Sequence, residues 1–383
     1  MDYYCSTKFT DMQVHVGSRL LYNCCHAYPE RISLDWLEAN PGKLFHTDTM
    51  LEDRKLMLDN KSCASCHHGC YKYEEQGLPS TRHHQQKIFI NDVHSPLQKL
   101  QISLSTDCNL TCVYCSPEWS TSWQKDIDKH GKYQLDGIDI HNNNLHKLWA
   151  KVKQKSRSTE SRFFKLLLKE ISLAKKLKRI EILGGEPLLN NQLDEIITKG
   201  EGKRLDIISG LGVSKSRLLT YLKKYEGKNI SFKISGETTG KNFEFMRYGS
   251  RWKDFCEKVN MISDHGFDIE FISTISNLTI LDFPNFYNKF KNDYKININF
   301  LIERPFLSPH VLDPKSKEIF ETWIEQQNDT SLLEPLRNIT DKDIQEVDKK
   351  NLLNYLTQFS NRRNLSLDFL PKNFKTWCGL SSN

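Results

Sequence analysis

The sequence predicts an α/β fold in which six strand–helix units form a partial (β/α)6 barrel, with a small cysteine-rich N-terminal module before it and a helical C-terminal segment after it. From residue 97 onward, short runs rich in β-branched residues alternate with longer runs that have apolar residues at helical spacing. This alternation is typical of parallel strands joined by helices. Six units are fewer than a closed TIM barrel has, so we expect a TIM-like barrel that is open on one side.

The individual elements follow from composition and periodicity. Short apolar runs predict strands at residues 98–104, 179–183, 206–208, 230–234, 268–275 and 296–302. Helical spacing of apolar residues predicts helices at residues 162–176, 215–225, 252–265, 283–290, 315–327 and 341–359. The first strand runs directly into a loop with three cysteines, and the second ends at Gly184.

These elements divide the chain into three regions. Residues 1–95 form the cysteine-rich module, residues 96–310 the barrel, and residues 311–383 a helical segment that covers the open side of the barrel. Within the barrel, residues 117–160 are polar, rich in Asn, Lys and His, and without a clear period. An insert of this length is either a lid over the site or a partly disordered segment.

The composition is that of a globular protein that stays in the cytoplasm. The 383 residues are 38% hydrophobic and 27% charged, and no apolar run is long enough to span a membrane. The first residues lack the basic and then apolar order of a signal peptide. The net charge of +6 comes from 54 basic and 48 acidic residues, which argues only weakly for a polyanionic partner, and we do not expect a nucleic-acid partner. The basic run at residues 147–155 fits a solvated helix face better than a nucleic-acid patch.

Eleven cysteines are many for a reducing compartment, where structural disulfides are rare. Nine of them lie in two groups, one before residue 71 and one at residues 108–115. Grouped cysteines in such a compartment indicate metal sites. Cys256 and Cys378 stand apart, and an inert buried thiol is the simplest interpretation of each.

The second group, Cys108, Cys112 and Cys115, places three thiolates on one short loop after a strand. Three protein ligands on a four-iron cluster leave one iron open to chelate a small molecule. A structural zinc site is the alternative, but it normally closes its shell with four ligands. The spacing therefore favours a [4Fe-4S] cluster.

This loop resembles the CxxxCx(aromatic)C loop of the radical S-adenosylmethionine (SAM) superfamily, with Tyr114 as the aromatic residue. The resemblance implies that the open iron binds SAM. It also implies an electron donor, either a reductase or a flavodoxin or ferredoxin, whose electron cleaves SAM to methionine and a 5′-deoxyadenosyl radical. In that family the aromatic residue packs on the adenine, so Tyr114 takes this role unless it is a packed core tyrosine.

A second match to the family follows the second predicted strand. Gly184, Gly185, Glu186 and Pro187 correspond to the GGEP motif, which contacts the amino group of SAM in the family. Glycines at a strand end let a ligand approach the backbone, and a carboxylate suits an ammonium group. Because the motif lies one strand–helix unit after the cysteine loop, it favours a SAM contact over an isolated turn.

Weaker matches lie further along the barrel. Ser235 and Glu237 follow the fourth strand, where the family presents polar groups to the ribose and carboxylate of SAM. The resemblance assigns Arg247 to the methionine carboxylate, with a surface or substrate-binding arginine as the alternative. Ser273 and Asn277, on and after the fifth strand, are assigned to the ribose, with a role inside the barrel as the alternative.

The N-terminal cysteines resemble the auxiliary cluster module of the SPASM/twitch radical SAM enzymes, although such modules more often follow the barrel. The resemblance, which extends to Gly17, Gly77, Ser80 and Arg82, implies a second iron–sulfur cluster. Its ligands would be Cys5, Cys24, Cys63 and Cys66, with Cys25, Cys70 and Cys378 as alternates. A four-thiolate zinc site remains the alternative, because a CxxC pair serves either metal.

The sequence thus predicts a radical SAM enzyme of oxidoreductase or transferase type that abstracts hydrogen from its substrate. The resemblance favours peptide or protein modification, or a dehydrogenation, with a nucleotide, sugar or other small metabolite as the alternative substrate. A zinc-binding nucleic-acid module without catalysis is the alternative from another class. No residue is assigned to catalysis, although Cys256 and the tyrosines are candidate hydrogen donors.

Overall fold

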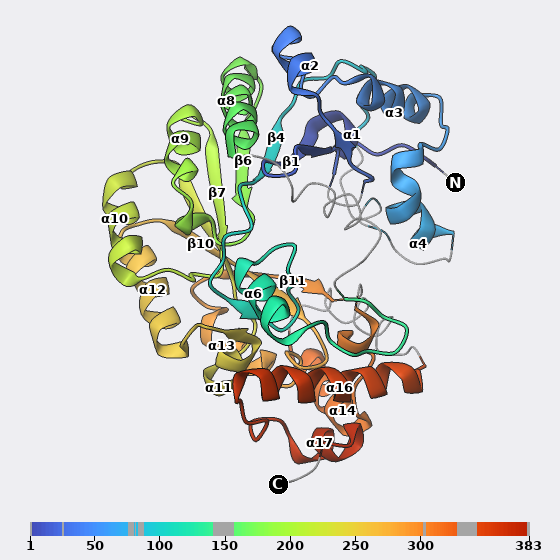
Figure 1. Ribbon diagram of the computed structural model, residues 1–383, viewed down its shortest axis with the longest axis vertical. Helices are drawn as coiled ribbons and strands as arrows, with labels where there is room; N and C mark the ends of the chain where they lie inside the picture. Colours follow the sequence, from blue (N-terminus) through green and yellow to red (C-terminus); the bar gives the residue numbers. More distant parts are fainter. Residues whose placement is uncertain are drawn as a thin grey trace. The chain divides into compact units, whose positions relative to one another are not determined.

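The computed structural model describes residues 2–24, 27–75, 80, 82, 88–140, 157–301, 304–327 and 343–380. It divides the chain into two compact units (Figure 1). The first comprises residues 1–105, 148–208 and 228–231, and the second comprises residues 106–147, 209–227 and 232–383.

The first unit contains a sheet with the strand order β7-β6-β4-β1-β2-β3. The strands are β1 (Asp11–His15), β2 (Leu20–Tyr22), β3 (Glu30–Arg31), β4 (Lys99–Ser103), β6 (Arg179–Leu183) and β7 (Arg204–Ser209), of which Ser209 is assigned to the second unit. Strands β1, β4, β6 and β7 are parallel to one another. Strand β2 pairs antiparallel with β1, and β3 pairs antiparallel with β2. The helices are α1 (Thr7–Thr10), α2 (Leu34–Ala39), α3 (Asp48–Leu58), α4 (Lys72–Glu74), α8 (Arg157–Leu173) and α9 (Gln192–Lys199).

Strand β1 joins the barrel sheet, which the sequence analysis did not foresee for the N-terminal module. Its alternation is only five residues long, too short to be recognised beside the cysteines. In the parallel register Met12 lies opposite Leu100 of β4, and Val14 lies opposite Ile102. Because these apolar side chains share a face, β1 extends the buried surface that β4 already presents.

The two faces of this sheet differ in polarity. Met12 and Leu100 line a cavity of about 240 Å³ together with Leu167 of α8, which lies beside the strands in Figure 1. On the opposite face Gln13 lies next to Gln101, and the strand register brings Glu181 into the same row. Helices therefore cover the apolar face, and the other face carries polar side chains.

The second unit continues the succession of strands and helices. Its strands are β8 (Ile230–Ser235, of which Ile230 and Ser231 are assigned to the first unit), β10 (Asp268–Ile275) and β11 (Lys295–Phe300), in the order β8-β10-β11, with β10 and β11 parallel. A separate two-stranded sheet joins β5 (Thr111–Cys112) and β9 (Arg247–Tyr248). The helices are α6 (Thr121–His130), α10 (Lys215–Tyr225), α11 (Gly240–Met246), α12 (Trp252–Asp264), α13 (Phe283–Phe290), α14 (Pro314–Glu325), α16 (Glu346–Arg363) and α17 (Lys372–Cys378).

Phenylalanines hold the strands and helices of this unit together. Phe271 of β10 is fully buried, and its ring lies 5.1 Å from that of Phe286 and 4.6 Å from that of Phe290, both on α13. Aromatic rings at these separations bury a large apolar area and fix the angle between helix and strand. The core of the second unit therefore sits between β10 and its covering helices.

The six predicted strands and the predicted helices are confirmed with small changes of their ends. Among these changes, the third strand extends over residues 204–209 rather than 206–208, and the last long helix spans residues 346–363 rather than 341–359. The interpretation of the insert at 117–160 as a segment without periodic structure is wrong for its first part, because α6 occupies residues 121–130 with Ser120 as its N-cap. Residues 141–156 of the insert, including the basic run, lie outside the described residues. In the described part of the chain, no helix has the length and apolar character that crossing a bilayer requires.

Candidate metal centre

The Cys108 loop, residues 106–116 of the second unit, is anchored by the small sheet of β5 and β9. The antiparallel register places Cys112 directly opposite Arg247, and the amide of Val113 donates to the carbonyl of Met246 at 2.9 Å. Cys112 is buried, whereas Cys108 and Cys115 are partly exposed. The middle cysteine of the predicted cluster loop is therefore fixed to a strand, and the outer two lie on either side of it.

The three thiols influence one another electrostatically. Burial raises the pKa of the Cys112 thiol, and the neighbouring Cys115 and Cys108 raise it further, whereas Arg247 lowers it. Burial also raises the pKa of Cys115. The Arg247 Nη1 atom lies 3.9 Å from the Cys112 Sγ atom, a position from which the guanidinium stabilises a thiolate. Arg247 thus acts electrostatically on both the Cys112 and the Cys115 thiols.

Within the described part of the chain, no three Cys, His, Asp or Glu side chains are grouped as they are around a metal ion. The thiols contact the surrounding protein instead. The amide of Leu110 donates to Cys108 Sγ at 3.4 Å, and Cys115 Sγ lies 3.8 Å from the Ser116 carbonyl. The chemistry of the donor set still fits an iron–sulfur cluster, because thiolates are its ordinary ligands and a cation beside them offsets their charge.

Three residues predicted to contact SAM converge beside Cys112. Tyr114 donates its hydroxyl to Glu237 Oε1 at 3.0 Å, and Arg247 Nη2 donates to Glu237 Oε2 at 2.7 Å and to the Tyr114 hydroxyl. Glu237 and Arg247 are almost completely buried. Burial raises the pKa of Tyr114 well above its ordinary value, so the phenol stays protonated. Arg247 therefore has a carboxylate partner within the protein.

Two other residues predicted to contact SAM are engaged with backbone atoms. The Ser273 hydroxyl donates to the Gly236 carbonyl at 2.6 Å. The Asn277 amide donates to the carbonyls of Phe306 and Val311 at 2.9 Å and 3.0 Å. Both side chains are fully buried, so they join β10 to the end of β8 and to the turn after β11. Ser235, the last residue of β8, is partly exposed.

The GGEP residues belong to the first unit, where they end strand β6. Gly184 and Gly185 have φ angles of +95° and +50°, which favour glycine. A Cβ atom at Gly184 would collide with the Ser103 hydroxyl. The buried Glu186 carboxylate accepts a hydrogen bond from the Leu188 amide at 3.3 Å and caps the turn at Pro187–Leu189. The motif therefore forms a tight turn with its carboxylate held inside.

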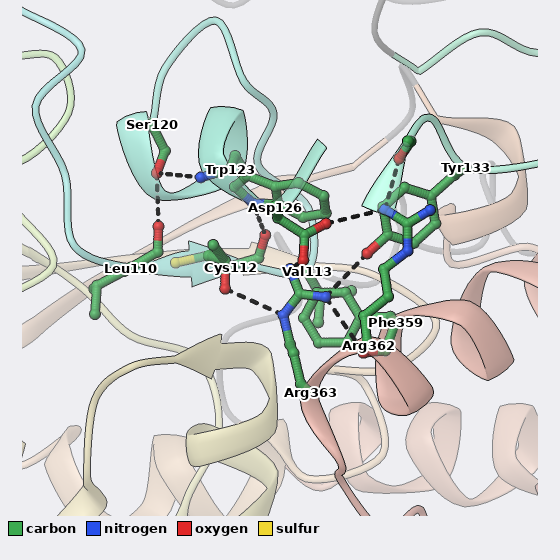
Figure 2. Close-up of polar contacts among 12 residues, drawn as sticks. Leu110, Cys112, Val113, Ser120, Trp123, Asp126, Tyr133, Phe359, Arg362 and Arg363 are labelled. Carbon is green, nitrogen blue, oxygen red and sulfur yellow. Dashed lines mark hydrogen bonds and ion pairs between the residues drawn. The ribbon is translucent and has the colours of Figure 1, made fainter. Parts of the chain in front are cut away.

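The sequence analysis missed the side chains that hold the backbone of the Cys108 loop. Figure 2 shows α6 residues Trp123 and Asp126 beside α16 residues Arg362 and Arg363, all next to the loop. Trp123 Nε1 donates to the Cys112 carbonyl at 3.0 Å. The only signal in the sequence was the helix start at Ser120, since contacts between such distant segments leave no local pattern.

The N-terminal cysteines lie in the first unit. Cys63 and Cys66 are buried in a cluster with Tyr4, Phe9, Met57 and Tyr71, and Cys5 packs against it. The hydrogen bond with Cys66 lowers the pKa of Cys63, while the same bond raises the pKa of Cys66, on which Cys24 also acts. Burial raises the pKa of Cys5, with a further contribution from Cys70. The structure thus brings the predicted auxiliary ligands into one neighbourhood.

A buried ion pair lies beside these thiols. Lys8, with 1% of its side chain exposed, places its Nζ atom 2.6 Å from Asp53 Oδ2 and 2.5 Å from Ser65 Oγ. The Ser65 hydroxyl is 3.6 Å from Cys63 Sγ. Although burial lowers the pKa of Lys8, its partners Cys66, Asp53 and Cys63 raise it above the ordinary value, so the amine stays charged.

The remaining predicted residues have these positions. Cys378 is buried at the end of α17 in the second unit, where its thiol lies 3.5 Å from the Lys375 carbonyl. Arg82 and Ser80 both bind the Glu74 carboxylate. Cys256, on α12, is partly exposed. Cys25 and Gly77 lie outside the described residues.

Comparison with known proteins identifies the central part of the chain. Residues 102–289 match the family model described as the Radical SAM superfamily. No curated protein is matched in sequence. Among solved structures, anSMEcpe with bound AdoMet and Cp18Cys peptide has a TM-score of 0.40 and 12% identity, and the match covers 62% of this chain and 61% of that one. Streptococcus suis SuiB bound to precursor peptide SuiA has a TM-score of 0.34 and 15% identity, with 97% and 74% covered. The match therefore spans about three fifths of the anSMEcpe chain.

Proposed function

We propose that this chain, whose residues 102–289 match the Radical SAM superfamily model, is a radical SAM enzyme, and that Cys108, Cys112 and Cys115 hold the [4Fe-4S] cluster to which SAM binds. The observation that carries the proposal is the loop itself: three thiols within eight residues, the middle one opposite the buried Arg247. Such a cluster, when bound and reduced, would supply one electron to SAM, whose S–C5′ bond would break to give methionine and a 5′-deoxyadenosyl radical. This proposal replaces the alternative of a zinc-binding module without catalysis.

The side chains around the loop bind and orient SAM in this proposal. Tyr114, protonated and fixed by Glu237, presents its ring to the adenine. Arg247 is fixed by two partners, so it offers a preorganised positive charge to the methionine carboxylate and to the Cys112 thiolate. In the first unit, the GGEP turn corresponds to the family's contact with the SAM amino group, because Gly184 offers backbone without a side chain and Glu186 offers a carboxylate that suits an ammonium group.

We further propose that Cys5, Cys24, Cys63 and Cys66 hold an auxiliary iron–sulfur cluster. Support comes from the shared burial of Cys63 and Cys66, the packing of Cys5 against their cluster, and the effect of Cys24 on Cys66. The positive charge of Lys8 beside these thiols favours their deprotonated, metal-binding form. Zinc at the same site is the competing assignment, and iron content decides between them.

The proposed reaction is hydrogen abstraction from a peptide or protein side chain, with a reductase, flavodoxin or ferredoxin as electron donor. The auxiliary module favours this substrate class, since the SPASM/twitch enzymes that it resembles often modify peptides. A nucleotide, sugar or small metabolite is the alternative that a substrate screen would reveal.

The test is anaerobic reconstitution with iron and sulfide, followed by iron counting and measurement of 5′-deoxyadenosine after dithionite reduction. Two cubanes predict about eight irons per chain. Replacing Cys108, Cys112 and Cys115 by Ala should leave about four irons and abolish 5′-deoxyadenosine. Cys256→Ala serves as a control for the iron count, which it should leave unchanged. A triple variant that still cleaved SAM would overturn the assignment.

A further inference from the structure

The C-terminal helix α16 contacts the Cys108 loop on both sides of the middle cysteine. The hydroxyl of Tyr355 donates to the Val113 carbonyl at 2.5 Å. Arg363 Nε donates to the Thr111 hydroxyl at 3.3 Å. Thr111 and Val113 flank Cys112, and Tyr355 is fully buried. The helix therefore holds the chain on both sides of Cys112, which lies opposite Arg247.

Helix α6 holds the same loop through its carbonyl groups. Trp123 Nε1 donates to the Cys112 carbonyl, and Ser120 donates to the Leu110 carbonyl at 2.7 Å. The Cys108 carbonyl accepts from the hydroxyl of Ser122 at 2.8 Å. Three alternate carbonyls of the loop thus have side-chain donors from α6 and its N-cap, and the Val113 carbonyl has its donor from α16.

Two buried ion pairs that share one aspartate join α6 to α16. Asp126 of α6 lies 3.1 Å from Arg362 Nη1 and 3.1 Å from Arg363 Nη2, and at most 9% of each of these side chains is exposed. Arg363 Nη1 also donates to the Tyr133 hydroxyl at 3.0 Å. Figure 2 shows Arg363 between Asp126 and the strand that carries Cys112. Because the Arg363 guanidinium contacts Asp126, Thr111 and Tyr133 at once, it links the placement of α16 to both α6 and the loop.

A cubane holds its ligands at fixed positions, so the backbone that carries the three thiolates has to stay in place around it. Each loop carbonyl bonded to a buried donor is restrained, because a buried carbonyl without a partner destabilises the fold. We propose that Tyr355, Arg363 and Asp126 are positioning residues for the cluster, which makes the C-terminal helix part of the cluster-binding apparatus. This inference rests on the proposed function of the Cys108 loop.

The first test is Tyr355→Phe in the full-length chain, which removes one hydroxyl and keeps the ring. The control is Tyr287→Phe, whose ring packs on Trp323 at 5.3 Å in the same unit. After reconstitution and reduction, we expect the Tyr355 variant to form 5′-deoxyadenosine about tenfold more slowly. Its electron paramagnetic resonance spectrum with SAM should broaden, a change that a loss of stability alone would not produce.

The second test compares two aspartates that both face α16. Asp126→Asn weakens the buried pair, whereas Asp136→Asn removes the exposed pair with Lys350 at 2.6 Å. We expect the first variant to lose affinity for iron in the Cys108 loop and the second to match the parent chain. Arg363→Met removes the charge and all contacts of the guanidinium, so it should lower iron affinity. Arg363→Lys keeps the charge but not the several donors of the guanidinium, so its iron affinity should lie between those of Arg363→Met and the parent chain.

The outcomes distinguish a failure of this inference from a failure of the proposed function. A parent chain that binds no cluster at Cys108 would overturn the proposed function and this inference with it. A parent chain that forms the cluster, with Tyr355→Phe and Asp126→Asn indistinguishable from their controls in spectrum and rate, would overturn this inference alone.

Discussion

The two cysteine groups of this chain are assembled in different ways. The three cysteines of the Cys108 loop lie within eight residues, and side chains from α6 and α16 hold the backbone between them. The N-terminal cysteines come from segments separated by up to about sixty residues, and an apolar cluster with a buried ion pair brings them together. In the first group local sequence sets the ligand spacing, whereas in the second the fold sets it.

This difference has consequences for how each site fails. The Cys108 loop keeps its spacing even if one support is lost, because its ligands are neighbours in the chain. The N-terminal thiols depend on the packing that surrounds Lys8 and Asp53, so losing that pair should disperse the ligands themselves. A substitution at one site should therefore reduce metal binding at that site and leave metal binding at the other site unchanged.

The largest effect on stability is expected for Lys8→Met. The change leaves Asp53 buried without its cation, which costs about 3–5 kcal/mol of unfolding free energy. Urea unfolding checks the stability, and iron counting should show loss at the N-terminal site only.

Lys61→Met is the matched control, since its pair with Asp59 is exposed and contributes about 0–1 kcal/mol. The double variant Lys8→Met/Asp53→Leu has no unpaired carboxylate. If it regains much of the lost stability, the unpaired Asp53 carboxylate is the cause of the loss. Equal effects of Lys8→Met and Lys61→Met would contradict the contrast between the two sites.

A smaller effect is expected for Glu237→Gln beside the Cys108 loop. The amide keeps the shape and the acceptor for Tyr114 but removes the charge that compensates Arg247, at a cost of about 2–3 kcal/mol. SAM cleavage should fall while the N-terminal metal is retained. Loss of both metals in this variant would show that the two sites are coupled.

The smallest effect is a pH dependence in the first unit. Burial lowers the pKa of His15 to about 3, from an ordinary value of 6.5. Above pH 6.5 both states are neutral at this residue, and as the pH falls the unfolded chain takes up a proton that the folded chain does not. Stability should therefore decrease by about 2 kcal/mol between pH 6.5 and pH 5.

Unfolding in urea at several pH values measures this decrease. His15→Gln should flatten the dependence, whereas His130→Gln, at an exposed position, should leave it unchanged. A parent chain whose stability did not change over this range would show that His15 is not held neutral.

Most of the fold could be predicted because its signals are local. The strand at residues 179–183 and the helices at 215–225 and 283–290 were predicted with their observed ends, since apolar periodicity within each segment specifies them. Strand β1 was missed because its five residues acquire meaning only through their register with β4. Helix α6 was missed because its apolar face is narrow, with Trp123 as its buried residue.

The sequence by itself determined the cysteine loop, the GGEP turn and the order of strands and helices, since each is encoded by residues a few positions apart. Only the tertiary structure decided that Arg247 pairs with Glu237 beside Cys112, that Lys8 lies among the N-terminal thiols, and that α16 supports the loop. Tyr355 and Val113 are 242 residues apart, and no periodicity links such positions. Their contact arises from the burial of aromatic side chains in a shared core, which depends on the whole chain.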